Sequence, residues 1–253
     1  MTISIAVAGK GGSGKTSIAS IIIRYMKKNG MVPVLAVDAD GNANLGESLG
    51  LVLEDTIGSV IATFNDDKIS IPSGLTKGVY LELKLNETIV ESEGLDLISM
   101  GRGEGTGCYC YPNTVLKKFI DELKGNYACL IMDNEAGMEH LSRRTTENMD
   151  ELFIISDHSV KGIRTVGRIL ELTKELKLDV KRQSVVINRV PGALDSHIKQ
   201  ELDQLGVEPI ATIPIDDEVS RFDLEKRSLL DLPDTSIAAI AVEKMMNAIL
   251  DRY

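Results

Sequence analysis

The chain has 253 residues and a formal net charge of −10 at pH 7, and 43% of its residues are hydrophobic. This length and composition predict one α/β domain with a large buried core. The acidic balance opposes binding to nucleic acid or to an anionic membrane surface. No apolar run approaches the ~18 residues of a membrane span, and no basic, signal-type segment precedes the first strand pattern. We therefore expect a cytoplasmic protein without a nucleic-acid or membrane partner.

A glycine-rich loop near the N-terminus is the strongest motif. Residues 9–16, GKGGSGKT, match the phosphate-loop pattern G-x-x-x-x-G-K-[ST]. The apolar, β-branched residues 3–8 predict a buried strand before the loop, and apolar residues at helical spacing predict a helix over 17–28. An ordinary glycine turn is the alternative, but such a turn does not require the full consensus with both flanks.

In a loop of this kind the backbone amides bind an anion, because glycines let the backbone approach it closely and the helix N-terminus favours negative charge. We expect Lys15 to reach the β- and γ-phosphates of a nucleotide and the Thr16 hydroxyl to ligate Mg²⁺. The predicted nucleotide-binding residues of this segment are Gly9, Gly11, Gly12, Ser13, Gly14, Lys15, Thr16 and Ser17.

Carboxylates follow two further apolar runs. Residues 32–37 run into Asp38 and Asp40, and residues 127–132 run into Asp133. Carboxylates at the C-terminal ends of parallel strands face the crevice where open sheets bind ligands. An apolar strand that ends in aspartate is the Walker B arrangement, so we expect Asp133 to hold Mg²⁺ directly or through water. A turn built from Asp, Gly and Asn remains the alternative after the first of these runs.

The rest of the chain alternates between strand and helix patterns. Strands are predicted at 95–100, 151–156, 184–189 and 208–213, and helices at 113–123, 160–176, 196–205 and 236–251. This alternation predicts a single α/β P-loop NTPase domain over 1–253, with a mostly parallel sheet of seven to eight strands and helices on both faces. Residues 52–94 predict a peripheral or insertion segment, in which 56–64 is helical and 80–85 alternates like a half-exposed strand.

Cys108 and Cys110 form a C-x-C pair, whereas the third cysteine, Cys129, lies inside an apolar run. So few cysteines do not indicate a secreted disulfide framework. Residues i and i+2 of an extended segment face the same side, so both sulfurs can reach one zinc, nickel, copper or iron ion. Thiol burial is the common alternative. The glycine-rich residues 101–107 and Pro112 favour a loop, where burial is less expected.

Taken together, the motifs resemble those of the ATPases with a deviant phosphate loop, the family of MinD, ParA and the nitrogenase iron protein. Within it they are most similar to the CooC and AcsF type of nickel-insertion ATPase. The similarity lies in Lys10 of K-G-G-x-G-K-T, the D-x-D at 38–40, the Cys-Tyr-Cys at 108–110, and D-x-x-A-G-x-E-H at 133–140. It covers nearly the whole chain, and residues 52–94 match least securely.

The resemblance implies catalytic roles beside that of Lys15. Lys10 would reach across a homodimer to the partner's nucleotide, as an arginine finger does. Asp40 would position the attacking water, and Asp38 would lie near the Mg²⁺. The implied reaction is Mg²⁺-dependent hydrolysis of ATP to ADP and phosphate.

The resemblance also implies where the nucleotide base lies. Asn188, at the end of its predicted strand, would contact the adenine ring, since an amide both donates and accepts hydrogen bonds. The backbone around Pro214 and Asp216 would frame the base. Asn188 is followed by Arg-Val-Pro rather than by a guanine-type N-K-x-D signature, so ATP and ADP are the expected cofactors.

For the cysteine pair the resemblance implies a nickel or zinc site formed by Cys108 and Cys110. Two such pairs on the two-fold axis of a dimer would supply the four sulfurs of a closed tetrahedral site. The client would be carbon monoxide dehydrogenase or acetyl-CoA synthase. Two alternatives remain open: a MinD/ParA-like positioning ATPase acting on membrane or DNA, and a redox ATPase with a bridging iron–sulfur cluster. The cluster cysteines of the nitrogenase iron protein do not form C-x-C.

Overall fold

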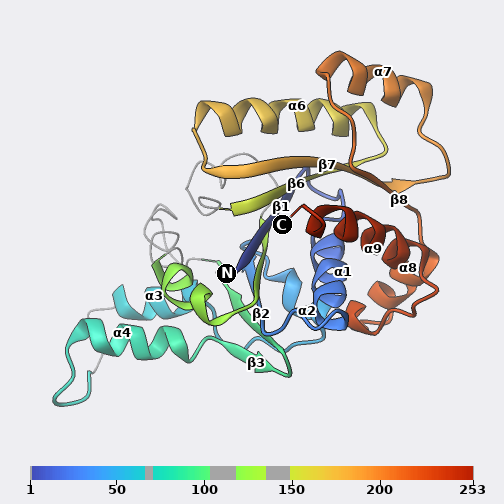
Figure 1. Cartoon of the computed structure of the whole chain (residues 1–253). Coiled ribbons are helices and arrows are strands. Elements are labelled where there is room, and N and C mark those ends of the chain that lie inside the picture. Colours follow the sequence, from blue (N-terminus) through green and yellow to red (C-terminus); the bar gives the residue numbers. More distant parts are fainter. Residues whose placement is uncertain (1, 66–70, 103–117, 135–148, 253) are drawn as a thin grey trace.

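A computed structural model describes residues 2–65, 71–102, 118–134 and 149–252 (Figure 1). Its sheet has eight strands in the order β3-β4-β2-β5-β1-β6-β7-β8. The strands are β1 Ile3–Gly9, β2 Val34–Ala39, β3 Val90–Ser92, β4 Leu95–Ser99, β5 Cys129–Asn134, β6 Met149–Asp157, β7 Val180–Val190 and β8 Ala211–Pro214. All neighbours pair in parallel except β3 and β4, which are antiparallel. The predicted fold class is confirmed.

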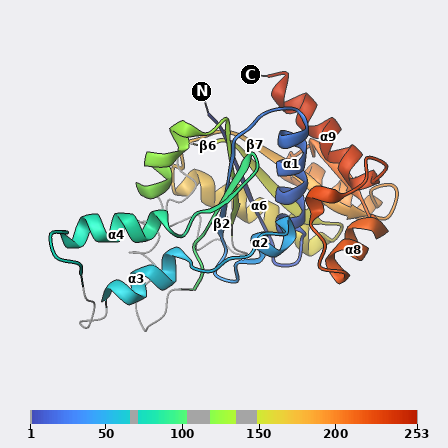
Figure 2. The ribbon, with the colours of Figure 1, turned by 90° about the horizontal axis from the view of Figure 1, so that it is seen from below.

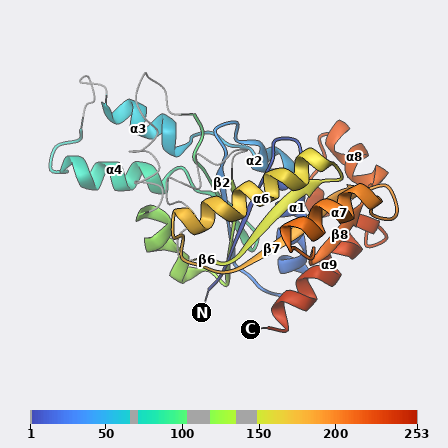
Figure 3. The same cartoon turned by 90° about the horizontal axis from the view of Figure 1, so that it is seen from above.

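Helices cover both faces of this sheet. They are α1 Lys15–Lys28, α2 Asn44–Leu49, α3 Ile57–Asn65, α4 Lys77–Asn86, α6 Val160–Glu175, α7 Ser196–Leu205, α8 Asp217–Leu224 and α9 Ile237–Leu250. Helices α6 and α7 lie on one face and α1, α8 and α9 on the other, while α3 and α4 extend at one end of the molecule (Figures 1, 2 and 3). Two apolar cores result, one on each face.

The central strand β1 shows why the sheet is covered on both sides. Ile5 and Val7 belong to the core under α1 and α9, whereas Ala6 and Ala8 belong to the core under α6. All four side chains are at most 2% exposed. A continuous apolar run is what a parallel strand buried on both faces requires, so the sequence pattern and the position of β1 agree.

Residues 80–85 were predicted as a strand, and this prediction is wrong. They lie within α4, which begins after Thr76, whose side chain accepts a hydrogen bond from Val79 N. Tyr80 packs its ring at a centroid distance of 5.5 Å from that of Phe64 in α3. The alternation of apolar and polar residues therefore reflects a helix with one buried side. The peripheral assignment of 52–94 stays a prediction.

Helix α8 was not predicted from the sequence. It is short, and its N-terminus is capped by Asp216, whose side chain accepts a hydrogen bond from Glu218 N. The final helix, by contrast, was predicted well: α9 is capped by Ser236 and ends one residue short of the predicted boundary. Of the helix predicted over 113–123, residues 118–123 are helical and the remainder lies outside the described residues.

Candidate nucleotide-binding site

The phosphate loop joins the end of β1 to the start of α1, as predicted. Gly12 and Gly14 adopt left-handed backbone conformations, with φ of +76° and +86°. A Cβ atom at Gly14 would lie 2.3 Å from Asn188 Nδ2. No described side chain caps the N-terminus of α1, and a helix N-terminus of this kind can bind an anion. The loop therefore has the geometry of a phosphate-binding site.

Two side chains at the end of β7 donate hydrogen bonds to the backbone of this loop. Asn188 Nδ2 donates to Ser13 O at 2.9 Å, and Arg189 Nη1 donates to Gly12 O at 3.0 Å. Asn188 and Lys15 are both buried. Sequence reasoning predicted Asn188 as a base contact and overlooked Arg189, although Arg189 is its immediate neighbour.

Asp38 and Asp133 are paired residues on the neighbouring strands β2 and β5. Thr16 Oγ1 donates to Asp133 Oδ2 at 2.5 Å. Asp133 is 1% exposed, and its Oδ1 has no hydrogen-bond partner among the described residues. An orphaned carboxylate oxygen beside a threonine hydroxyl is the donor set that Mg²⁺ prefers. These residues fit the ion.

Burial raises the pKa of both carboxylates. It raises the pKa of Asp38 to about 7, with the nearby Asp133 as the next cause. Burial also raises the pKa of Asp133 to about 6, against the hydrogen bond from Thr16 and the charge of Lys15. A cation at this place favours the ionised forms and lowers both values. The electrostatics of the site therefore support cation binding.

Asp38 also shapes the turn that follows β2. Its Oδ1 accepts a hydrogen bond from Asp40 N at 3.0 Å, and its Oδ2 accepts one from Leu45 N at 2.8 Å. Both oxygens of Asp38 thus accept hydrogen bonds from the backbone. Asp40 lies in the turn itself and is partly exposed.

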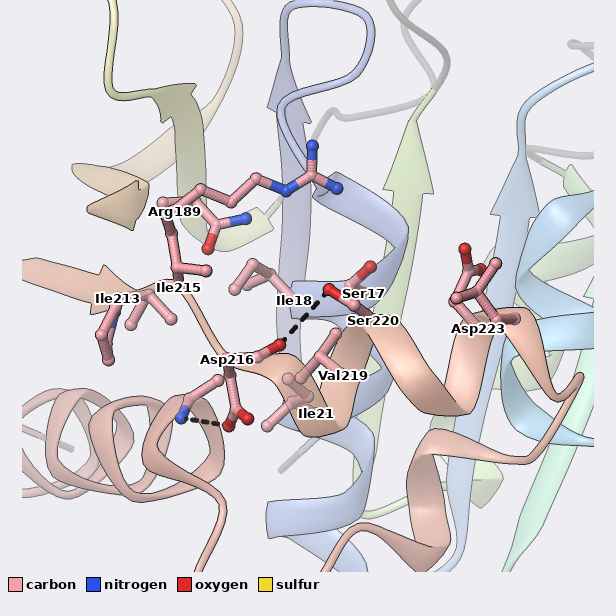
Figure 4. Close-up of a pocket in the computed structure, with 14 residues that line it drawn as sticks. Ser17, Ile18, Ile21, Arg189, Ile213, Ile215, Asp216, Val219, Ser220 and Asp223 are labelled. Carbon is pink, nitrogen blue, oxygen red and sulfur yellow. Dashed lines mark hydrogen bonds between the residues drawn. The ribbon is translucent and has the colours of Figure 1, made fainter. Parts of the chain in front are cut away.

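A cavity of about 460 Å³ opens beside the N-terminus of α1, between the ends of β7 and β8 and the helices α8 and α9 (Figure 4). The predicted base residues Asn188, Pro214 and Asp216 all line it, together with Ser17. Apolar side chains that the sequence analysis did not assign to the nucleotide site also line it: Ile18, Ile21, Ile213, Val219 and Ala238. A mostly apolar pocket next to a phosphate loop suits a nucleotide base.

The carboxylate of Asp216 is occupied by the chain itself. Its Oδ1 accepts from Glu218 N at 2.9 Å, and its Oδ2 accepts from Ser236 Oγ at 2.6 Å and from Ala238 N at 2.9 Å. These bonds hold the pKa of Asp216 below its usual value despite burial. What Asp216 offers the cavity is therefore its backbone, in keeping with the predicted frame for the base.

Comparison with known proteins agrees with this geometry. Residues 4–229 match the model of the CobQ/CobB/MinD/ParA nucleotide binding domain. The chain belongs to this family. It is 38% identical to an uncharacterized ATP-binding protein of Methanocaldococcus jannaschii, over 98% of both chains. It is 26% identical to the carbon monoxide dehydrogenase accessory protein CooC of Rhodospirillum rubrum, over 98% of this chain and 96% of that one.

Among solved structures, the cell division ATPase MinD of Pyrococcus furiosus superposes with a TM-score of 0.74 over 100% of both chains, at 21% identity. This likeness confirms the fold. The family match and the phosphate-loop geometry together establish the chain as a P-loop ATPase.

In this ATPase the additional loop lysine has a partner within its own chain. Lys10 Nζ lies 3.2 Å from Asp157 Oδ2 at the end of β6. Both side chains are partly exposed, so the pair can exchange partners at low cost. The predicted reach of Lys10 across a dimer would require this ion pair to open.

The predicted metal ligands Cys108 and Cys110 lie outside the described residues. Within the described ranges, no group of three or more His, Cys, Asp and Glu residues could hold a metal ion. Cys129 is fully buried in β5, and burial raises the pKa of its thiol to about 12. It is a neutral core residue, as its apolar surroundings in the sequence predicted.

Proposed function

We propose that this ATPase is a metallochaperone, which binds nickel through Cys108 and Cys110 and inserts it into carbon monoxide dehydrogenase or acetyl-CoA synthase. The similarity to the CooC protein of R. rubrum over 98% of the chain supports this function. Thiolates suit nickel, and zinc is the other ion that they would hold. Two chains would provide the four sulfurs that a closed tetrahedral site requires.

The observation that carries the proposal is the position of Met100, after which the chain continues toward the cysteine pair. Met100 N, directly after β4, donates to Asp38 O at 2.8 Å. Residues 100–102, after which the chain continues toward Cys108, therefore begin beside Asp38 of the nucleotide site. A change in the position of Asp38 can shift Met100. Such a shift would link metal binding at the cysteine pair to the nucleotide state.

The hydrolysis step follows from the same residues. The loop amides and Lys15 would bind the phosphates, and Thr16 and Asp133 would hold a Mg²⁺ ion that neutralises charge on them. Asp40 would orient the attacking water. Lys10, released from Asp157, would stabilise charge on the nucleotide of the partner chain.

A nickel titration under anaerobic conditions, coupled to size-exclusion chromatography with light scattering, tests the proposal. We expect one nickel per two chains, accompanied by dimer formation. The double variant Cys108→Ala, Cys110→Ala loses this binding and keeps ATPase activity, whereas the buried Cys129→Ala is the matched control and binds nickel normally. Undiminished nickel binding by the double variant would refute the proposal.

A MinD-like positioning ATPase is the second candidate, because the MinD fold matches the whole chain. Such a protein needs a surface for membrane or DNA. The net charge of −10 opposes both, and no described helix is long and apolar enough to cross a bilayer. Helix α9 carries Glu243 as well as Lys244 and is not a basic amphipathic helix. ATP-dependent co-sedimentation with liposomes or DNA would favour this candidate over the metallochaperone.

A further inference from the structure

Arg102 reaches back to the turn that follows β2. Its Nη2 donates to Asn42 Oδ1 at 2.6 Å, across sixty residues of sequence. Asn42 in turn donates twice to Asp40 Oδ1, from its backbone N at 2.8 Å and from its Nδ2 at 3.0 Å. Arg102 is therefore linked through one intermediate side chain to the carboxylate expected to position the attacking water.

The backbone that carries Arg102 is held on two sides. Met100 N donates to Asp38 O, and Met100 O accepts from Gly58 N, both at 2.8 Å. A Cβ atom at Gly58 would lie only 2.7 Å from Arg102 O, and one at Gly101 would lie 2.3 Å from Thr56 Oγ1. Residues 100–102 are thus clamped between β2 and the N-terminus of α3.

The turn itself has fewer supports. Asn42 is exposed and Asp40 is partly exposed. The side chain of Arg102 passes close to Gly41, where an added Cβ would lie 3.6 Å from Arg102 Cγ. The guanidinium of Arg102, held on a fixed backbone, therefore supports a solvent-exposed turn by donating a hydrogen bond to Asn42. A hydrogen bond from a charged donor is stronger than one from a neutral donor.

We propose that Arg102 is a positioning residue for ATP hydrolysis: it fixes Asn42, and Asn42 fixes the carboxylate of Asp40. The inference rests on the proposed role of Asp40 in orienting water. It assigns Arg102 no contact with the nucleotide. Displacement of a positioned group by 1 Å can cost a large factor in rate, whereas an exposed polar pair contributes little to stability. The contribution of Arg102 to the rate of hydrolysis and its contribution to folding stability can therefore be measured separately.

Steady-state ATP hydrolysis of the full chain tests the proposal. Arg102→Ala should lower kcat about tenfold while KM for ATP and the melting temperature stay close to those of the wild type. Arg102→Lys, which keeps a cationic donor, should recover part of the loss. The double variant Arg102→Ala, Asn42→Ala should be no slower than Asn42→Ala alone, because both changes break the same link. Arg168→Ala, an exposed arginine on α6, is the matched control.

Two results would overturn the proposal. One is a wild-type kcat for Arg102→Ala while Asp40→Ala is inactive, which leaves the role of Asp40 intact and removes that of Arg102. The other is a wild-type kcat for Asp40→Ala, which removes the role of Asp40 and with it that of Arg102. Neither result bears on nickel stoichiometry at Cys108 and Cys110, so failure of the metallochaperone proposal is recognised separately.

Discussion

Lys10 and Asp157 form an ion pair of 3.2 Å that connects the phosphate loop to the end of β6 within one chain. Asp157 also accepts a hydrogen bond from Ser159 Oγ at the start of α6. In the single chain, the lysine that the family resemblance assigns to a partner's nucleotide is therefore paired with a carboxylate of its own chain. If Lys10 reaches a partner's nucleotide, as the resemblance implies, dimerisation would compete with this ion pair for the same ammonium group.

Asp157→Asn should strengthen ATP-dependent dimerisation, because it removes the charge that competes for Lys10. Partly exposed ion pairs contribute ~0.2–1 kcal/mol, which corresponds to a roughly 1.4- to fivefold lower dissociation constant per pair opened. Sedimentation velocity with a non-hydrolysable ATP analogue measures this change. Lys10→Ala is the companion variant and should dimerise more weakly. Equal dimerisation of Asp157→Asn and the wild type would show that the pair does not restrain Lys10.

The two left-handed glycines of the phosphate loop should differ in their tolerance of a side chain. At Gly14 an added Cβ would meet Asn188 Nδ2 at 2.3 Å, whereas at Gly12 no atom of the described residues lies within 4 Å of it. Both substitutions cost backbone strain of ~1 kcal/mol or more, but only Gly14→Ala also displaces the amide that anchors the loop. We expect Gly14→Ala to weaken ADP binding at least about tenfold more than Gly12→Ala. Calorimetric titration with Mg-ADP compares them, and equal affinities would contradict the anchoring role of Asn188.

The phosphate loop could be predicted from the sequence because its determinants are local. Strand, glycines and helix follow one another within residues 3–28, and each pattern has one structural solution. The proximity of Asp38 and Asp133 could also be predicted, since parallel strands bring their carboxyl ends to one edge of the sheet.

Contacts that depend on side-chain reach between distant segments could not be predicted. Asn188 and Ser13 are 175 residues apart, and Arg102 and Asn42 are sixty. Nothing in the neighbourhood of Arg102 in the sequence distinguishes it from a solvated arginine. Helix α4 was mistaken for a strand because its apolar residues fit both periods, and the deciding feature is the cap at Thr76. The apolar wall of the base cavity was not predicted, because Ile18 and Ala238 follow the helical spacing of core residues in α1 and α9. Helix α8, which supplies Val219, was itself not predicted.

The cavity beside α1 should contribute affinity for the base and none for the phosphates. Val219 lines it from α8, so Val219→Phe fills part of the space that the base would occupy. We expect this variant to bind ATP at least about tenfold more weakly, while inorganic tripolyphosphate binds as it does to the wild type. Val219→Ala is the control, since it enlarges the cavity without blocking it. Equal loss of ATP and tripolyphosphate would show a damaged loop instead of a filled base pocket.

Asp133 should make the nucleotide-free, Mg²⁺-free protein less stable as the pH rises. Its folded pKa of about 6 lies above the ordinary aspartate value of 3.8, so between these values the unfolded chain releases a proton that the folded chain retains. The destabilisation by Asp133 is absent below pH ~4, grows as the pH rises through 6 and is complete near pH 7 to 8. Asp133→Asn keeps an acceptor for Thr16 and removes the charge. It should therefore stabilise the metal-free protein at pH 8 by about 3 kcal/mol, and not at pH 4.

Mg²⁺ should reverse this effect. The ion favours the ionised carboxylate, so Mg-ADP should stabilise the wild type more at pH 8 than at pH 5, and should stabilise Asp133→Asn less than the wild type at pH 8. Urea titrations at the two pH values, with and without Mg-ADP, measure these three stabilisations. A stability difference between Asp133→Asn and the wild type that is the same at both pH values would mean that Asp133 stays ionised in the folded metal-free chain. The orphaned Oδ1 would then need a partner other than a bound proton or cation.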